Sequence, residues 1–99
     1  MSGAGVELVD DAAEKSRAAF MRAQGLAGAA ERTFAAVLRV RSGDGGSIEH
    51  LRTAAAALAT AREGTDEAMR EAMESTDRLL DALGADAKAR VLERGRGTG

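Results

Sequence analysis

Apolar and small side chains recur at alternating steps of three and four residues along two long stretches of the chain. In the first stretch the recurring positions are Val6, Val9, Ala13, Ser16, Phe20, Ala23, Ala27, Ala30, Phe34 and Val37. In the second stretch they are Ile48, Leu51, Ala55, Leu58, Arg62, Thr65, Met69, Ala72, Thr76, Leu79 and Leu83. This spacing is the heptad pattern of helices that pack along one seam. The pattern predicts one helix over about residues 6–41 and another over about residues 48–83.

The residues between the two stretches have the composition of a turn. Residues 42–47 read Ser-Gly-Asp-Gly-Gly-Ser, and glycine and Asp favour positive φ and chain reversal. Ser47 is a suitable N-cap for the second helix. Gly84 is a suitable residue to end that helix, and Asp86 can cap a last short helix over about residues 87–94. We expect disorder in residues 1–5 and in the tail 95–99.

Composition supports a thin helical fold. The chain has 99 residues, no proline and only two aromatic residues, Phe20 and Phe34, while alanine dominates the 44% of residues that are apolar. Alanine, glutamate, arginine, leucine and methionine are strong helix formers, and no segment has the pattern of a strand. The sequence therefore predicts a single all-α domain over residues 1–99. Its fold is a two-helix antiparallel, coiled-coil-like hairpin with a short C-terminal helix.

A short turn between helices of similar length also predicts a register. Residues whose numbers add up to about 89 should face each other, so that Phe20 meets Met69 and Phe34 meets Ala55 inside the hairpin. The same register brings Gly25 opposite Gly64, which forms a glycine waist. The interpretations of that waist stay open: a close crossing of the two backbones, or else a hinge or a place where another helix docks.

Charge and cysteine content exclude several classes of function. The formal net charge is −2, whereas general nucleic-acid binding needs a basic stripe. No cysteine is present, which excludes disulfides and thiolate zinc sites. No apolar run approaches the roughly 20 residues of a membrane span. The acidic N-terminal stretch lacks the features of a Sec signal peptide. We expect a cytoplasmic protein, or one secreted without such a signal.

The sequence offers no convincing site for chemistry. Glu67, Glu71 and Glu74 share one face of the second helix, but arginines interleave with the acids, which is typical of a solvated face. His50 is the only histidine and is expected to face solvent in the first turn of the second helix. The glycine-rich residues 42–47 lack the Gly-Lys-Ser/Thr ending of a phosphate-binding loop. We expect no enzyme activity, no cofactor and no metal ion.

The remaining signal is an apolar surface in excess of what one hairpin can cover. Burial of such a stripe against other helices is a sufficient driving force for a four-helix assembly. We predict a homo-oligomer, or a hetero-oligomer with another helical protein. The expected interface residues are Phe20, Leu26, Phe34, Leu38, Leu58, Met69, Met73 and Leu80.

Length, two long helices, a turn that contains glycine, acidic character and the lack of a Sec signal together resemble the Trp-x-Gly helical hairpins of type VII secretion. The resemblance covers the whole chain and is architectural. At the turn, Ser42-Gly43-Asp44-Gly45-Gly46 matches the family only in its glycine, since the chain has no tryptophan. The C-terminal Tyr-x-x-x-Asp/Glu export signal of the family is also missing. The resemblance implies a small secretion substrate, or a partner of one.

A second resemblance is to the helical-hairpin anti-sigma factors of actinomycetes that bind cyclic di-GMP. Their helices carry Glu-x3-Ser-x2-Arg-x3-Gln-x3-Asp, and Glu71, Ser75, Arg78 and Asp86 have that spacing, with Ala82 in place of the glutamine. This resemblance implies a regulatory hairpin that sequesters a protein partner. The alanine, arginine and glycine content is typical of a GC-rich, for example actinobacterial, genome and is compatible with both families.

Overall fold

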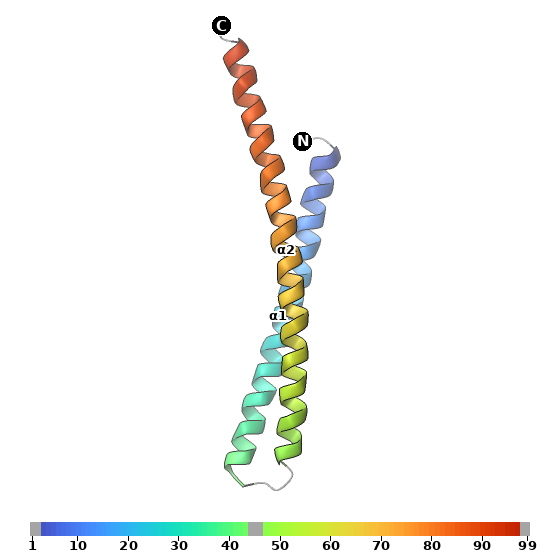
Figure 1. Cartoon of the computed structure of the whole chain (residues 1–99), viewed down its shortest axis with the longest axis vertical. Coiled ribbons are helices and arrows are strands. Elements are labelled where there is room, and N and C mark those ends of the chain that lie inside the picture. Colours follow the sequence, from blue (N-terminus) through green and yellow to red (C-terminus); the bar gives the residue numbers. More distant parts are fainter. Residues whose placement is uncertain (1–2, 44–46, 98–99) are drawn as a thin grey trace.

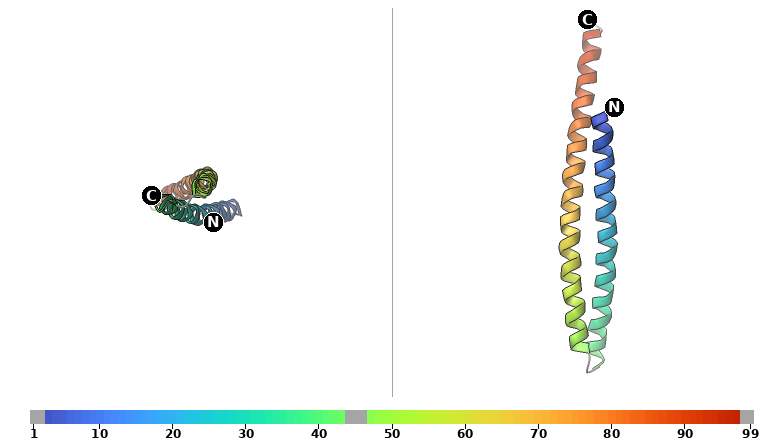
Figure 2. Two further views of the ribbon diagram at one scale, coloured as in Figure 1. Left: turned by 90° about the horizontal axis from the view of Figure 1, so that it is seen from below. Right: turned by 90° about the vertical axis from the view of Figure 1, so that its right-hand side faces the viewer.

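The computed structural model is a helical hairpin. It describes residues 3–43 and 47–97, with side chains for residues 3, 5–43 and 48–85, and in this part of the chain it contains two helices and no strand. Helix α1 spans Gly3–Arg41 and helix α2 spans Ser47–Gly97. The helices run antiparallel in a rod of 81 × 20 × 13 Å, and the end of α2 projects beyond the N-terminus of α1 (Figures 1 and 2). The prediction of an all-α hairpin is confirmed.

Helix α2 is longer than the heptad pattern indicated. It continues through Gly84 to Gly97, so the short helix expected over residues 87–94 is part of α2. Gly84 does not adopt a positive φ, and a single glycine costs a helix interior only about 1 kcal/mol relative to alanine. The strong helix formers on both sides of Gly84 offset that cost. Residues 1–2, 44–46 and 98–99, which include parts of the expected turn and tails, lie outside the described residues.

The end of α1 is closed by local hydrogen bonds. The Ser42 amide donates to the Leu38 carbonyl and the Gly43 amide donates to the Val40 carbonyl, both at 3.1 Å. The Ser42 hydroxyl donates to the Arg39 carbonyl at 2.9 Å. Gly43 has a φ of 83°, a conformation that glycine adopts without the steric cost of a Cβ. The first glycine of the predicted turn therefore ends α1.

The seam between the helices is built from small side chains. Its fully or almost fully buried residues are Ala12, Ala19, Ala29 and Ala36 of α1, with Thr65 and Ser75 of α2. In α1 each buried residue comes one position before a residue of the predicted row. The side of α1 that faces α2 therefore differs from the predicted side by about 100°. Phe20 and Phe34 are consequently 61% and 65% exposed, and the predicted contacts of these rings inside the hairpin are wrong. Small residues at the seam let the two helices lie close together, which bulky rings would prevent.

The register also differs from the prediction. The Thr65 hydroxyl lies 3.0 Å from the Arg22 carbonyl, and the Thr33 hydroxyl lies 3.3 Å from the Ala54 carbonyl. The residue numbers in each of these pairs add up to 87 rather than about 89. The observed register is therefore shifted by about two residues from the predicted one.

The predicted glycine waist does not form. Gly25 is exposed, and no heavy atom lies within 4 Å of the position that a Cβ would occupy. Gly64 lies beside Arg22, whose Nη1 would be 3.5 Å from an added Cβ. Neither glycine serves a close approach of the two backbones.

Candidate functional site

Most of the exposed large apolar side chains lie along one face of the hairpin, and Met21, Leu38 and Val40 are exposed outside it. We call this surface the apolar face. Its residues are Val6, Val9, Phe20, Phe34 and Val37 of α1 and Ile48, Met69, Met73, Leu80 and Leu83 of α2, each at least 38% exposed. Contiguous apolar surface of this kind typically marks a site of interaction with another protein.

Helical geometry places the α1 residues of this surface on one side of the seam. The four buried alanines of α1 point towards α2. The residue after each of them lies about 100° around the helix, and these residues are Ala13, Phe20, Ala30 and Val37. The third residue after each lies about 60° around in the opposite sense, and these residues are Lys15, Arg22, Arg32 and Arg39. One flank of α1 is thus apolar, and the other carries this row of basic residues.

The α2 residues of the apolar face lie on the same side of the hairpin. A shallow groove on this side is lined by Leu26 and Leu58 together with Ala55, Ala59, Arg62 and Asp66. Residues seven apart occupy the same side of a helix. Seven-residue steps lead from Ala55 and Arg62 to Met69, and from Asp66 to Met73 and then Leu80. The two apolar rows therefore border one continuous surface.

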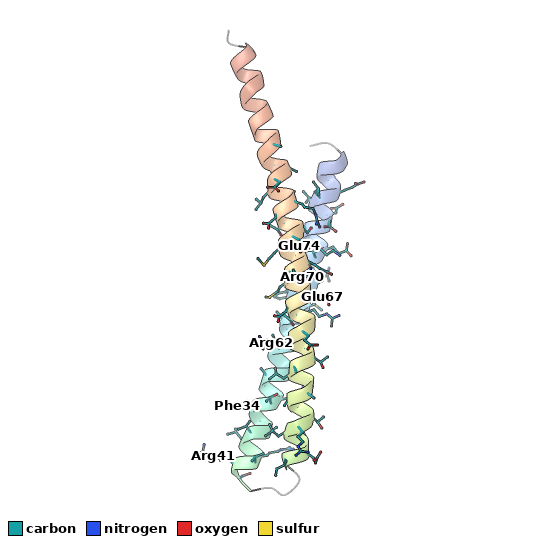
Figure 3. All side chains as sticks on the ribbon, in the orientation of Figure 1. Phe34, Arg41, Arg62, Glu67, Arg70 and Glu74 are labelled. Atoms are coloured by element: carbon teal, nitrogen blue, oxygen red, sulfur yellow. The ribbon has the colours of Figure 1, made fainter. Side chains whose placement is uncertain are left out.

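The opposite flank is charged. Arg32 and Arg39 border one groove on this side, and Arg22, Glu67 and Glu71 border another. Glu67, Arg70 and Glu74 follow one another along α2 (Figure 3). The basic row on α1 was missed by sequence reasoning, although its position three residues after each buried alanine could have revealed it once the seam was known. This asymmetry makes the hairpin amphipathic as a whole.

A polar cluster on the charged flank ties the helices together near their open end. The buried Ser75 hydroxyl donates a hydrogen bond to the Asp11 carboxylate, and Arg78 lies 3.6 Å from the same carboxylate. Lys15 lies 4.0 Å from Glu71. The Ser75 hydrogen bond, followed by the positive charges of Lys15 and Arg78, lowers the pKa of Asp11 below its ordinary value. The cluster is a structural clasp because each of its contacts joins one helix to the other.

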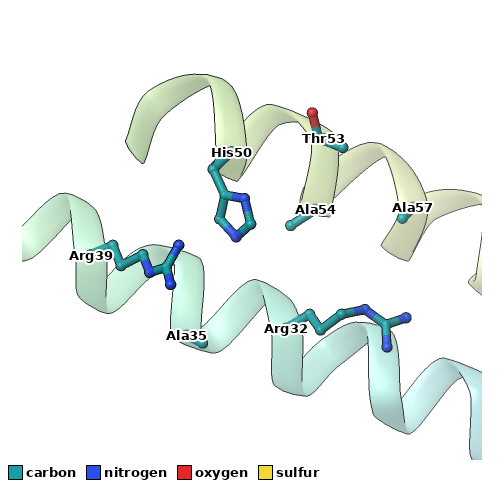
Figure 4. Close-up of a pocket in the computed structure, with 7 residues that line it drawn as sticks. All are labelled: Arg32, Ala35, Arg39, His50, Thr53, Ala54 and Ala57. Atoms are coloured by element: carbon teal, nitrogen blue, oxygen red, sulfur yellow. The ribbon is translucent and has the colours of Figure 1, made fainter. Parts of the chain in front are cut away.

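His50 lies in the groove between Arg32 and Arg39, above a floor of alanines (Figure 4). It is exposed, as expected of a residue in the first turn of α2, and its ring points towards α1. Neither arginine has a carboxylate partner among the described side chains. The groove therefore presents unneutralised positive charge, without any group arranged as a nucleophile beside it.

The predicted interface residues occupy three different environments. Phe20, Phe34, Met69, Met73 and Leu80 belong to the apolar face. Leu26 and Leu58 are half-buried at the edge of the groove on that face. Leu38 is 44% exposed and lies one turn after Phe34, about 40° around α1, so it borders the apolar face on the side away from the seam.

Four carboxylates of α2, those of Glu49, Asp66, Glu71 and Glu74, form ion pairs. Glu71 pairs with Lys15, and Glu74 lies 3.4 Å from Arg70. Among the side chains that the structure describes, no group of three or more acidic or histidine residues is arranged to hold a metal ion. Within the same residues, neither helix contains a segment apolar enough to cross a membrane.

Comparisons with known family models, with curated proteins and with solved structures found no match to this chain.

Proposed function

We propose that this protein is a non-enzymatic helical interaction module, whose apolar face packs against the helices of another chain. The observation that carries the proposal is the division of apolar residues between the two surfaces of the hairpin. The seam holds alanine, serine and threonine, whereas phenylalanine, methionine and leucine lie on the apolar face.

The proposal follows from the energetics of burial. Burying a large apolar side chain stabilises an assembly by about 1.5–3 kcal/mol, so the exposed rows of the apolar face represent a large unused driving force. The charged flank, by contrast, is compatible with water. A partner that covers the apolar face and leaves the charged flank in solvent completes a four-helix arrangement.

A matched pair of variants tests this function. Met73→Asp places a charge within the apolar face. Met21→Asp places the same charge on the far side of α1, because the exposed Met21 follows the buried Ala19 by two residues, about 200° around the helix. The chain and both variants are purified from the source organism, and the mass of each native complex is measured. We expect the complex to persist in Met21→Asp and to be lost in Met73→Asp. The proposed function would be contradicted if every sample contained only monomers, or if both variants formed the same amount of complex.

We include in the proposal a role as a small type VII secretion substrate or partner. This part rests on the resemblance in length and hairpin architecture alone. Detection of the chain in the culture medium of cells with an intact secretion system, and its retention in cells lacking the secretion ATPase, would support the role. Retention in both strains would remove it from the proposal and leave the interaction module intact.

The regulatory alternative is less favoured by the observed contacts. Glu71, Ser75 and Arg78, which match the anti-sigma spacing, contact Lys15 and Asp11 of α1. The side chain of Asp86 lies outside the described residues. Calorimetric titration with cyclic di-GMP tests this alternative, and micromolar binding that Arg78→Ala abolishes would favour it over the interaction module.

A further inference from the structure

The two ends of the hairpin carry opposite net charge. The half nearer the turn, residues 24–62, contains five arginines and three acidic residues. The open half, residues 3–23 and 63–85, contains five basic and eleven acidic residues. Their formal charges are therefore +2 and −6. Complementary charge favours one orientation of two partners and like charge disfavours the other.

This polarity distinguishes the two ways in which a second copy can stack on the apolar face. If both hairpins point in the same direction, the two acidic halves lie against each other. If the second copy is turned end for end, each acidic half lies against the basic half of the other copy. The apolar face is then covered and the charges are complementary at both ends.

Arg62 and Asp66 supply a register for the end-for-end arrangement. They lie at the groove of the apolar face, are 3.7 Å apart, and their side chains are 77% and 66% exposed. A two-fold axis beside residue 64 of α2 places Arg62 opposite Asp66 of the second copy, and Asp66 opposite its Arg62. A charged pair within an apolar surface is a recognised means of setting register between helices.

The same axis pairs large side chains with smaller ones. Along α2, Met69 then faces Ala59 of the second copy, and Met73 faces its Ala55. Along α1, the hairpin register puts residues 22–23 beside residue 64, since Gly64 lies against Arg22. Among the positions on the apolar flank of α1, the pair whose midpoint lies closest to this point is Phe20 and Ala23 of the second copy. Large residues that fill the space above small ones are the normal basis of helix packing.

We propose that the partner on the apolar face is a second copy of this chain, turned end for end, so that the two hairpins form an antiparallel four-helix bundle. This inference rests on the proposed function and names its partner. It leaves the charged flank, with the cationic groove around His50, open to solvent on both sides of the bundle.

Sedimentation of the purified full chain tests whether the partner is a second copy. We expect twice the 10.2 kDa mass of one chain at micromolar concentration. Arg62→Asp puts two carboxylates opposite each other and should weaken the dimer by about tenfold or more. The double change Arg62→Asp with Asp66→Arg should restore it. A monomer at all concentrations, with the helical signal retained, would overturn the inference.

Orientation is tested by disulfide formation, because the natural chain has no cysteine. A Met69→Cys chain mixed with an Ala59→Cys chain should cross-link under mild oxidation if the copies are end for end. A Met69→Cys chain mixed with a Ser16→Cys chain is the control. The observed register puts residues 17–18 level with Met69, so these two positions lie close when both copies point the same way. Cross-linking of the control pair alone would overturn the proposed orientation.

These outcomes separate the inference from the proposed function. A chain that is monomeric when pure, yet loses a complex with a different helical protein on Met73→Asp, would refute the second copy as partner and support the interaction module. A chain that forms neither a dimer nor a complex with another helical protein would refute both the inference and the proposed function.

Discussion

The seam and the apolar face are both continuous rows of small or apolar residues, yet they differ in side-chain size. The seam is made of alanine with a buried threonine and serine, and its hydroxyl groups find carbonyl or carboxylate acceptors. The apolar face carries both phenylalanines and two of the four methionines. The hairpin is therefore closed by close backbone approach and hydrogen bonds, while its large apolar groups remain available for another chain.

The strongest test of this contrast is to enlarge a seam residue. Ala29 is 2% exposed, so Ala29→Leu should destabilise the hairpin by ~1–3 kcal/mol through overpacking. The matched control is Ala56→Leu, at an exposed position of α2 that faces away from the seam and lies outside the apolar face, which should change stability by at most about 0.5 kcal/mol. Chemical unfolding followed by circular dichroism measures both. Equal effects at the two positions would show that the seam does not pass through Ala29.

A smaller effect is expected when a seam hydroxyl is removed. Thr65→Val keeps the shape of the side chain but loses the contact with the Arg22 carbonyl, which should cost about 0.5–1.5 kcal/mol. Thr60→Val, at an exposed position on the same helix, serves as the control. An unchanged unfolding midpoint in the Thr65 variant would mean that packing alone holds the seam.

Substitution of the interior glycines should stabilise the protein. Gly25→Ala meets open space and should add several tenths of a kcal/mol to about 1 kcal/mol through helix propensity. Gly64→Ala should also stabilise, because the added methyl makes only ordinary contact with Arg22. Thermal melts of both variants check this, and a lowered midpoint for both would restore the glycine waist expected from the sequence.

The smallest effect concerns the clasp at Asp11, which is a solvent-accessible site. The pKa of Asp11 in the folded protein is lowered from its ordinary value of 3.8. The ionised carboxylate therefore stabilises the fold at pH values above 3.8, and this stabilisation is lost as the pH falls through the lowered pKa. Asp11→Asn should therefore lower the unfolding midpoint at pH 7. The difference from the natural chain should shrink below a pH of about 4. A difference that is independent of pH would exclude charge as the source.

The amino-acid sequence by itself determined the helical class, the two long helices and the position of the reversal. Heptad spacing, the absence of proline and the glycines after Arg41 are local features, and Gly43 adopts the positive φ that a turn requires. The candidate surface was predictable in part, since Phe20, Phe34, Met69, Met73 and Leu80 were identified as interface residues from their size and spacing. Whether they contact a partner stays a prediction.

The tertiary structure alone decided which apolar row closes the hairpin. Two rows of α1, one residue apart, both satisfy the spacing of three and four, because alanine and phenylalanine count equally in a periodic pattern. Side-chain volume distinguishes them: the row of Ala12, Ala19, Ala29 and Ala36 allows the helices to approach, and the row of Phe20 and Phe34 does not. The register and the absence of a glycine waist follow from the same contact geometry, which depends on residues distant in the chain and has no local signature.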